Sequence, residues 1–286
     1  MLLVTGATGH LGSSVVAQLL KNISPNQFIV TSGNSMGIQK LESQGLQARL
    51  ANFNNTNSLH NAFKGIEKLL LISTMDLNRF EQHKNVVDAA KVRGLKHLIY
   101  TGLAIKDIQT SGVKLLMESH FQTEDYIKAS GLSYTILRNT MYADALTQIL
   151  GNNALNQDIN LPGGNGKVPY VLRREMGDAT ANLLLQNGHE NKTYNITGSR
   201  HFDFAALAAI MSRFSGNTIR YNDITTEDFK HILQQIGLPD FAIYLHTGTL
   251  YDIKTGQYEV ESQILEKLLG RPHASMEAII KELFII

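Results

Sequence analysis

Three glycines near the start of the chain constrain its fold more than any other feature, in the run Val4-Thr5-Gly6-Ala7-Thr8-Gly9-His10-Leu11-Gly12. The apolar run Leu2–Val4 leads into them, and apolar residues at helical spacing follow between Val15 and Leu20. A strand, a glycine turn and a helix start in this order leave backbone N–H groups and the positive end of a helix dipole open to an anion. We therefore predict that the turn binds the pyrophosphate of a dinucleotide, with an ordinary tight turn as the alternative.

Short apolar runs alternate with helical patterns through the first half of the chain. We expect strands at Leu2–Thr5, Phe28–Thr31, Leu46–Leu50, Leu69–Ile72, Leu98–Thr101 and Tyr134–Leu137, with helices near 10–20, 36–43, 57–64, 77–93 and 115–129. Continuously apolar runs are typical of strands covered on both faces, and strands separated by helices indicate a parallel sheet with right-handed crossovers. The expected fold class is therefore α/β, a doubly wound Rossmann sheet with a small, mostly helical C-terminal lobe.

The second half of the chain has a looser pattern. After a turn-rich loop at 161–166 and a short apolar run at Val168–Leu172, we expect a helix near 175–185 and a strand at Thr193–Ile196 that return to the main sheet. Asp203 is a candidate N-cap for a helix to Phe214, the run 225–228 is a candidate capping box, and two further helices are expected near 259–269 and 276–285. These patterns divide the chain into a nucleotide-binding core at 1–140, with return elements near 175–197, and a lobe at 141–286.

Composition excludes several classes of function. The 26 Lys and Arg residues nearly balance the 25 Asp and Glu residues and are dispersed, so we expect neither a nucleic-acid partner nor an acidic membrane surface. The chain contains no cysteine, and its ten histidines lack metal-ligand spacing, so disulfides and thiolate chemistry are excluded and no metal site is expected. No apolar segment approaches the roughly 20 residues that span a bilayer, and no secretion signal is recognisable, so a cytoplasmic location is expected.

Several stretches resemble one known family. The opening run at 5–12 is similar to that of the atypical, NmrA-like short-chain dehydrogenases. The stretches 97–102, 134–139 with Tyr142, and 188–195 resemble one branch of that family, the bacterial NAD(P)H quinone oxidoreductases and triphenylmethane dye reductases. The resemblance covers essentially the whole chain. It implies a nicotinamide cofactor in the cleft, and hydride transfer to a small, flat, conjugated acceptor such as a quinone.

The same resemblance implies a set of site residues. Those expected to contact the cofactor are Gly6, Ala7, Thr8, Gly9, His10 and Leu11 in the turn, Gly33, Asn34, Ser35, Asn52 and Phe53 at the adenosine end, and Ser73, Thr74, Thr101 and Asn139 at strand ends. Those expected near the chemistry are Thr101, His120 and Tyr142. Each has an alternative without a catalytic role. Thr101 would be an ordinary strand-end threonine, His120 a polar helix residue and Tyr142 a core aromatic.

The chain departs from related dehydrogenases at the usual proton-transfer pair. Where extended short-chain dehydrogenases carry Tyr-x-x-x-Lys, this chain has Leu116 and His120, and the nearby Tyr126 is followed four residues later by Ser130. Without a lysine to lower the pKa of a tyrosine, alcohol dehydrogenation and sugar-nucleotide epimerisation are disfavoured. Reduction of a quinone or dye tolerates the loss, because the acceptor is already electrophilic.

A second departure concerns the choice of cofactor. NADPH-binding relatives place an arginine where this chain has Gly33, and NAD-binding relatives place an acid there. Relatives carry an acidic residue after the third strand, and this chain has Asn52 at that position. The cofactor is therefore expected to be NADP or NAD, with NADPH slightly favoured by the resemblance alone. A non-catalytic NmrA-type redox sensor is the second candidate function, and the oligomeric state stays open.

Three further charged residues are interpreted as making structural contacts. Arg138 precedes Asn139 at the end of an expected strand and is interpreted as an ion-pair partner. Arg173 and Glu175 are expected to contact each other at a helix start.

Overall fold

The computed structural model describes residues 1–151 and 153–284 of the 286-residue chain. Its centre is a seven-stranded sheet in the order β3-β2-β1-β4-β5-β6-β8, with every neighbouring pair parallel. The strands are β1 (Leu2–Val4), β2 (Phe28–Ser32), β3 (Ala48–Leu50), β4 (Lys68–Leu71), β5 (His97–Leu103), β6 (Tyr134–Asn139) and β8 (Lys192–Ile196). The predicted doubly wound α/β fold is confirmed, and the late strand returns to the sheet beside β6 as expected.

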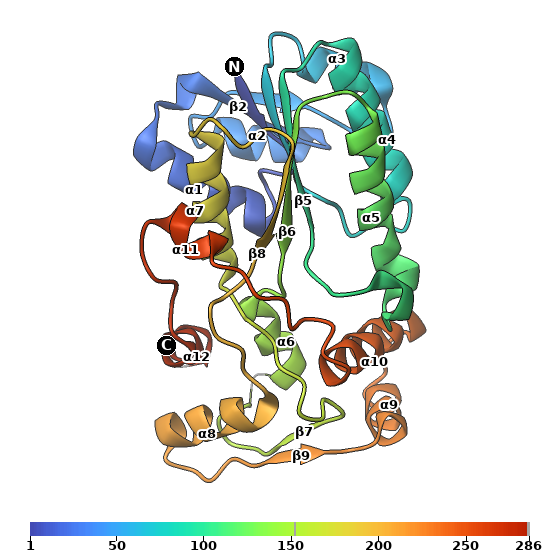
Figure 1. Cartoon of the computed structure of the whole chain (residues 1–286), viewed down its shortest axis with the longest axis vertical. Helices are drawn as coiled ribbons and strands as arrows, with labels where there is room; N and C mark the ends of the chain where they lie inside the picture. Colours follow the sequence, from blue (N-terminus) through green and yellow to red (C-terminus); the bar gives the residue numbers. More distant parts are fainter. Residues whose placement is uncertain (152, 285–286) are drawn as a thin grey trace.

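Helices cover both faces of this sheet (Figure 1). On one face lie α1 (His10–Asn22), α7 (Arg173–Leu184) and α11 (Ile264–Leu269); on the other lie α3 (Thr56–Ala62), α4 (Arg79–Val92) and α5 (Lys114–Ala129). The helix α2 (Ser35–Glu42) follows β2, and its Leu41 packs in the same core as α1. The sheet is apolar on both sides because each face is buried under one helical layer.

A lobe lies beyond the carboxyl ends of the strands, at the lower end of the molecule in Figure 1. It contains α6 (Leu146–Leu150), α8 (Phe204–Ser215), α9 (Thr226–Gln235), α10 (Asp240–Lys254), α12 (Met276–Phe284) and a parallel pair of short strands, β7 (Ile159–Leu161) and β9 (Tyr221–Asp223). Its apolar side chains form a core of their own. Short 3₁₀ turns occur at Pro25–Gln27, Ile108–Thr110 and Ala143–Ala145. The division into residues 1–140 and 141–286 stays a prediction.

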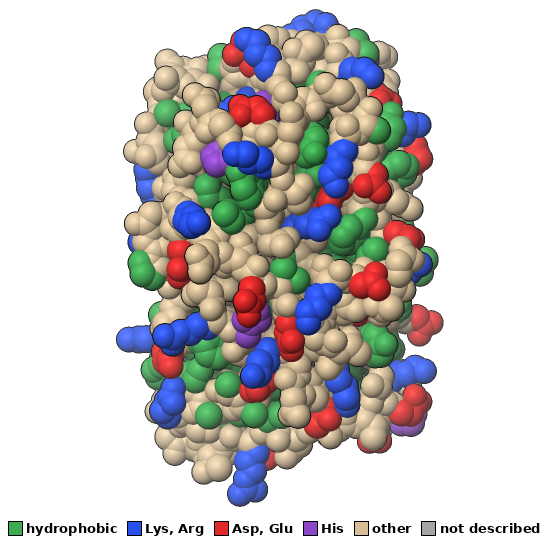
Figure 2. Space-filling view, viewed as in Figure 1, with side chains coloured by type: hydrophobic (Ala, Val, Ile, Leu, Met, Phe, Trp, Pro, Cys, Tyr) green, Lys and Arg blue, Asp and Glu red, His purple; other side chains and the backbone are tan. Residues whose placement is uncertain are grey.

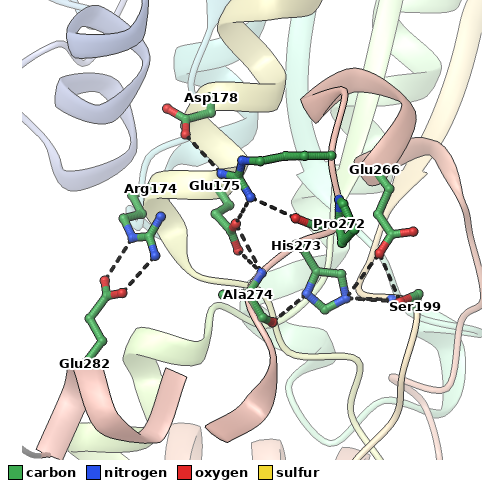
Figure 3. A network of polar contacts seen from close by, with 10 residues as sticks. Arg174, Glu175, Asp178, Ser199, Glu266, Pro272, His273, Ala274 and Glu282 are labelled. Atoms are coloured by element: carbon green, nitrogen blue, oxygen red, sulfur yellow. Dashed lines mark hydrogen bonds and ion pairs between the residues drawn. The ribbon is translucent and has the colours of Figure 1, made fainter. Parts of the chain in front are cut away.

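Polar contacts tie the C-terminal segment back to α7 (Figure 3). The buried Glu175 carboxylate accepts from the Arg271 guanidinium at 2.6 Å and from the backbone N–H of Ala274 at 3.0 Å. Arg174, one residue earlier, forms a two-bond ion pair with Glu282 on α12. These contacts hold the lobe's last helix against the helix that covers the sheet.

The lobe differs from the expected elements at several points. No helix was expected at α10, where Thr, Tyr, Ile and one Gly have weak helix propensity; packing against the lobe core stabilises it. The helix expected at 259–269 begins at Ile264, and the short apolar run Val168–Leu172, for which no element was specified, makes isolated bridges. The Thr225 cap is present, but the Asp228 carboxylate accepts from the Thr225 hydroxyl and not from its backbone N–H. The expected last helix ends at 285, which lies outside the described residues.

The visible surface carries charges of both signs without a large patch of either (Figure 2). Among the described residues, no helix combines the length and apolar character needed to cross a membrane.

Candidate active site

A cleft of about 770 Å³ runs along the carboxyl ends of the strands, beside β1 where the strand order reverses. Open α/β sheets bind ligands at such a point. Of the residues predicted for the site, those that line the cleft are Gly6, Thr8, Gly9, His10, Leu11, Gly33, Asn34, Asn52, Phe53, Ser73, Thr74, Thr101 and Tyr142. The structure thus brings residues from six separate segments together, and their roles toward a cofactor stay a prediction.

Three residues predicted to contact the cofactor, Ala7, Ser35 and Asn139, do not line this cleft. Ala7 is buried in the core under α1, and its backbone N–H already donates to the Thr31 carbonyl oxygen at 3.3 Å. Ser35 is the first residue of α2 and lies outside the cleft lining. Asn139 lines an adjoining chamber instead, together with His120, which was predicted to lie near the chemistry.

The glycine turn is held against the sheet and leaves the start of α1 open. The Thr5 hydroxyl donates to the Leu70 carbonyl oxygen at 3.0 Å and accepts from the Ile72 N–H at 2.9 Å. Gly6 has a φ of +61°, and a Cβ on Gly12 would lie 2.1 Å from the Gly6 carbonyl oxygen, so both positions require glycine. Gly9 is the N-cap of α1 and provides no side-chain cap, so the first amides of the helix face the cleft without one.

The adenosine end of the cleft is polar but carries no matching charge. The Asn34 side chain accepts from the Gly37 N–H at 2.8 Å and caps α2, while the Asn52 side chain accepts from the Asn54 N–H at 2.9 Å. Among the described residues that line the cleft, Arg173 alone carries a fixed positive charge, and it lies at the other end beside Tyr142. The structure therefore gives no charge-based reason to prefer NADP or NAD.

A second cavity of about 340 Å³ adjoins the cleft and shares Ser73, Met75, Tyr142 and Gln148 with it. The sheet contributes the end of β6, α5 contributes His120, and the lobe contributes apolar side chains of α9 and α10. We call this cavity the chamber. A group bound at the shared residues can reach both spaces, which is the geometry that a transfer between two ligands requires.

Tyr142 stands at the boundary between cleft and chamber. Its phenol oxygen accepts from the Asn139 amide at 3.2 Å, and the Arg173 guanidinium lies 4.8 Å from the centre of its ring. Arg173 also pairs with Asp144 at 3.5 Å. The expected contact between Arg173 and Glu175 is wrong, because residues two positions apart on a helix point about 200° apart and Glu175 turns toward the C-terminal segment.

Two buried polar atoms at the end of β6 have no hydrogen-bond partner within the described residues: Asn139 Oδ1 and Thr140 Oγ1. Both residues are almost fully buried and line the chamber. Because a buried polar atom without a partner destabilises a fold by roughly 1–3 kcal/mol, such atoms indicate a place where a ligand completes the bonding.

His120 faces the chamber from α5 and contacts Tyr100 at the base of the site. The Tyr100 hydroxyl lies 2.8 Å from His120 Nδ1, and both side chains are buried. The Thr123 hydroxyl is a second hydrogen-bonding neighbour of the Tyr100 hydroxyl, so the contact fits either tautomer of His120. With Tyr100 as the donor, Nδ1 accepts and the His120 proton lies on Nε2. Burial and the nearby Arg79 hold the pKa of His120 well below its usual range, so the ring is neutral.

Arg79 is the charged centre of this buried cluster. Its guanidinium donates to the carbonyl oxygens of Thr74 and Leu116 and to the Ser119 hydroxyl, and two methionine sulfurs complete its contacts. None of these partners is a carboxylate, and the side chain is fully buried. Burial, together with the Arg79 charge, lowers the pKa of His83 to about 3. No role in the site is predicted from the sequence for Arg79 or Tyr100. A basic residue at a helix start carries no sequence signal that it is buried.

Thr101 and Arg138 have well-defined local partners. The Thr101 hydroxyl accepts from the Ser73 N–H at 3.0 Å and joins the ends of β4 and β5 beneath the cleft. Arg138 donates to both oxygens of the buried Glu124 carboxylate, with the shortest contact at 2.6 Å. The interpretation of Arg138 as an ion-pair partner is confirmed.

The sequence and the fold both match known proteins. Residues 1–268 match the model of the NmrA-like family. The chain belongs to the NmrA-like family. It is 33% identical to quinone oxidoreductase 2 of Escherichia coli K12 over 287 residues, which covers 99% of each chain.

Two solved structures of family members are similar over nearly their whole length. The NADPH-dependent quinone oxidoreductase of Escherichia coli in complex with NADPH superposes with a TM-score of 0.91 at 32% identity, covering 99% of this chain and 100% of that one. The triphenylmethane reductase of Citrobacter sp. in complex with NADP(H) superposes with a TM-score of 0.89 at 32% identity, covering 99% of both. The resemblance inferred from the sequence is thus confirmed.

Proposed function

We propose that the protein is an NAD(P)H-dependent reductase that transfers a hydride to a small, flat, conjugated acceptor such as a quinone. The observation that carries the proposal is the junction of the cleft with the chamber at Ser73, Met75, Tyr142 and Gln148. One space contains the open helix start that suits a pyrophosphate, and the other is a separate, mostly apolar pocket. The NADPH and NADP(H) complexes of the two similar structures favour NADPH as the cofactor.

The residues present fit a nicotinamide dinucleotide. The exposed amides at the start of α1 suit a pyrophosphate, and the close approach of Gly12 to Gly6 keeps side chains out of its way. At the other end, the unpartnered Asn139 Oδ1 suits the N–H of a carboxamide. When bound, the reduced cofactor would supply the hydride.

The protein's own part in the reaction is to orient the acceptor and stabilise its developing negative charge. His120 offers its Nε2–H to an oxygen of an acceptor in the chamber, and the Thr140 hydroxyl offers a second donor. Preorganised donors aimed at developing charge stabilise a transition state because they need no reorganisation. Tyr142 forms one wall beside the acceptor, held by Asn139 and Arg173.

The position of Tyr126 disfavours epimerase-like or alcohol dehydrogenase chemistry. Its hydroxyl donates to Asp88 at 2.6 Å on the outer side of α5, away from the chamber lining. No tyrosine–lysine pair therefore faces the acceptor among the described residues.

One observation favours a second candidate, a non-catalytic dinucleotide sensor. The adenosine end lacks a fixed charge for either the 2′-phosphate or the ribose hydroxyls, so selectivity between cofactors would be weak. Such a protein would bind both dinucleotides and turn over neither.

Turnover separates the two candidates. The purified protein would be mixed with NADPH or NADH and a panel of quinones, and the loss of nicotinamide absorbance followed. Turnover above the uncatalysed rate supports the reductase. Cofactor binding by calorimetry without turnover of any acceptor would support the sensor, and no binding of either dinucleotide would overturn both.

A further inference from the structure

A third cavity of about 430 Å³ extends from the chamber between α6, the segment 157–161 and α9. It shares Gln148, Ile149, Phe229 and His246 with the chamber, so the two spaces adjoin at these side chains. We call this cavity the side groove. It begins at the chamber and opens at the surface of the lobe.

The side groove is lined largely by aliphatic side chains: Ile149, Leu150, Ile159, Leu161, Ile232, Leu233, Ile236 and Leu238. Among its described lining residues the one carboxylate, on Asp158, accepts from the Arg220 N–H at 2.8 Å. Burial lowers the pKa of His246, which keeps that ring neutral. The described lining therefore offers no fixed positive charge to an anion, and its surface suits hydrocarbon.

Two isoleucines at the mouth of the side groove are exposed although their side chains are apolar. Ile232 on α9 is 43% exposed and Ile236, the C-cap residue of that helix, is 66% exposed, while Phe229 and Leu233 on α9 are buried. All four line the groove, so α9 presents a continuous apolar surface from the chamber outward. Exposed apolar surface that is continuous with a pocket is typical of a ligand site.

We propose that the acceptor carries an aliphatic side chain and that the side groove binds it. The inference rests on the proposed function: the ring occupies the chamber beside His120 and Tyr142, and the chain passes Ile149 and Phe229 into the groove. A chain suits this space better than a second ring system because Phe229 is the one carbocyclic aromatic side chain that lines the described groove. Its continuity with the chamber favours one ligand over a separate partner protein.

The test is a series of quinones that differ in the length of an n-alkyl substituent, from methyl to decyl. Each buried methylene strengthens binding by up to about fourfold, so KM is expected to fall progressively as the chain lengthens until the groove is filled. Calorimetry with the oxidised cofactor present measures binding alone, because no hydride can then be transferred. The dissociation constant is expected to fall in parallel with KM.

A matched pair of variants tests whether the tighter binding of long alkyl chains arises in the side groove. Ile232→Asp places a carboxylate at its mouth, whereas Leu20→Asp makes the same change on α1, where Leu20 is also 43% exposed and lines none of the three cavities. Ile232→Asp is expected to raise KM for decyl-quinone at least tenfold and to leave KM for methyl-quinone unchanged. Leu20→Asp is expected to change neither.

The outcomes distinguish this inference from the function on which it rests. If no quinone of any length is reduced, the proposed function fails. If all lengths are reduced with the same KM, or if Ile232→Asp affects short and long quinones equally, the function stands and the side groove is not the site of the chain. If Ile232→Asp instead changes the oligomeric state measured by light scattering and leaves the KM for decyl-quinone unaltered, the isoleucines belong to an interface between copies and the inference is overturned.

Discussion

The Tyr100 hydroxyl forms a hydrogen bond of 2.8 Å with Nδ1 of His120, so a strand of the sheet holds a histidine that faces the chamber. The bond joins β5 to α5 beneath the proposed acceptor site. With Tyr100 as the donor, Nε2–H is the group that His120 presents. This relationship gives Tyr100 a positioning role in the proposed reaction, although it does not line the chamber itself.

The substitution Tyr100→Phe is expected to lower kcat about 10- to 100-fold and to change KM little. His120 then loses the bond that, with Tyr100 as donor, holds its proton on Nε2. The unpartnered Nδ1 also lowers the free energy of unfolding by about 1–3 kcal/mol. Steady-state kinetics and urea denaturation measure the two effects. Tyr126→Phe is the control, since it removes the hydroxyl of a tyrosine that contacts Asp88 outside the site. An unchanged kcat in Tyr100→Phe would show that the bond is only structural.

The buried histidines are expected to make the fold sensitive to acid. His83 has a folded-state pKa of about 3 because of burial and Arg79, against about 6.5 when unfolded, and the pKa of His120 is lowered in the same way. The unfolded state therefore binds more protons below pH 6.5. The stabilising contribution of each histidine is complete above that pH and is lost, at up to about 1.4 kcal/mol per pH unit, as the pH falls toward 3.

Urea denaturation at pH 7.5 and at pH 5.5 measures this loss, with His83→Gln as the comparison. The Thr123 hydroxyl donates to the Ser119 carbonyl oxygen, so its own oxygen can accept from a glutamine amide in place of His83, and the amide does not titrate between these pH values. The variant is expected to lose about 1 kcal/mol less stability than the unmodified chain between the two conditions. An equal loss in both would show that His83 is not the group that titrates.

Gly9→Val is expected to weaken dinucleotide binding more than 100-fold while the chain still folds. A Cβ at Gly9 would lie 3.3 Å from the Gly6 carbonyl oxygen, and the branched side chain would occupy the space before the first amides of α1. Calorimetry with NADPH measures the binding. Ser13→Val introduces the same side chain at an exposed position of α1 that does not line the cleft, and should bind normally. Normal binding by Gly9→Val would refute the pyrophosphate assignment.

Sequence patterns predicted the sheet better than the lobe, for a physical reason. The strands of the core are continuously apolar, and the glycine turn needs glycine for steric reasons, so local sequence determines both. The helix α10 forms because the lobe core buries one of its faces, and the pairing of β7 with β9 joins segments about 60 residues apart. Such contacts leave little trace in a short window of sequence.

The same difference applies to the site. Strand-end residues such as Ser73 and Asn139 were predicted, because a parallel sheet brings the carboxyl ends of its strands to one edge. Burial of Arg79 without a carboxylate partner depends on helix α5 lying over it, and a sequence pattern cannot show which side of α4 that helix covers. The pairing of Tyr100 with His120 depends on the same packing.

Gly33→Arg is expected to strengthen binding of NADPH relative to NADH by about tenfold or more. The nearest atom to a Cβ at Gly33 is the Ala51 carbonyl oxygen at 4.0 Å, so the backbone has room for a side chain, and a guanidinium there can pair with a 2′-phosphate. The ratio of the two dissociation constants is measured by calorimetry, with Gly33→Ala as the control for the loss of glycine. An unchanged ratio would mean that the ribose edge lies elsewhere.

Arg138→Met is expected to lower the free energy of unfolding by about 3–5 kcal/mol, because it leaves the Glu124 carboxylate buried at 1% exposure without its two-bond partner. Lys128, at 3.6 Å, compensates only in part. Since Arg138 lines neither the cleft nor the chamber, the dissociation constant for NADPH should stay unchanged at a temperature where the variant is folded. The double variant Glu124→Gln/Arg138→Met removes the unpaired charge and should recover part of the stability. If it is no more stable than Arg138→Met, the loss comes from the packing of the arginine and not from its charge.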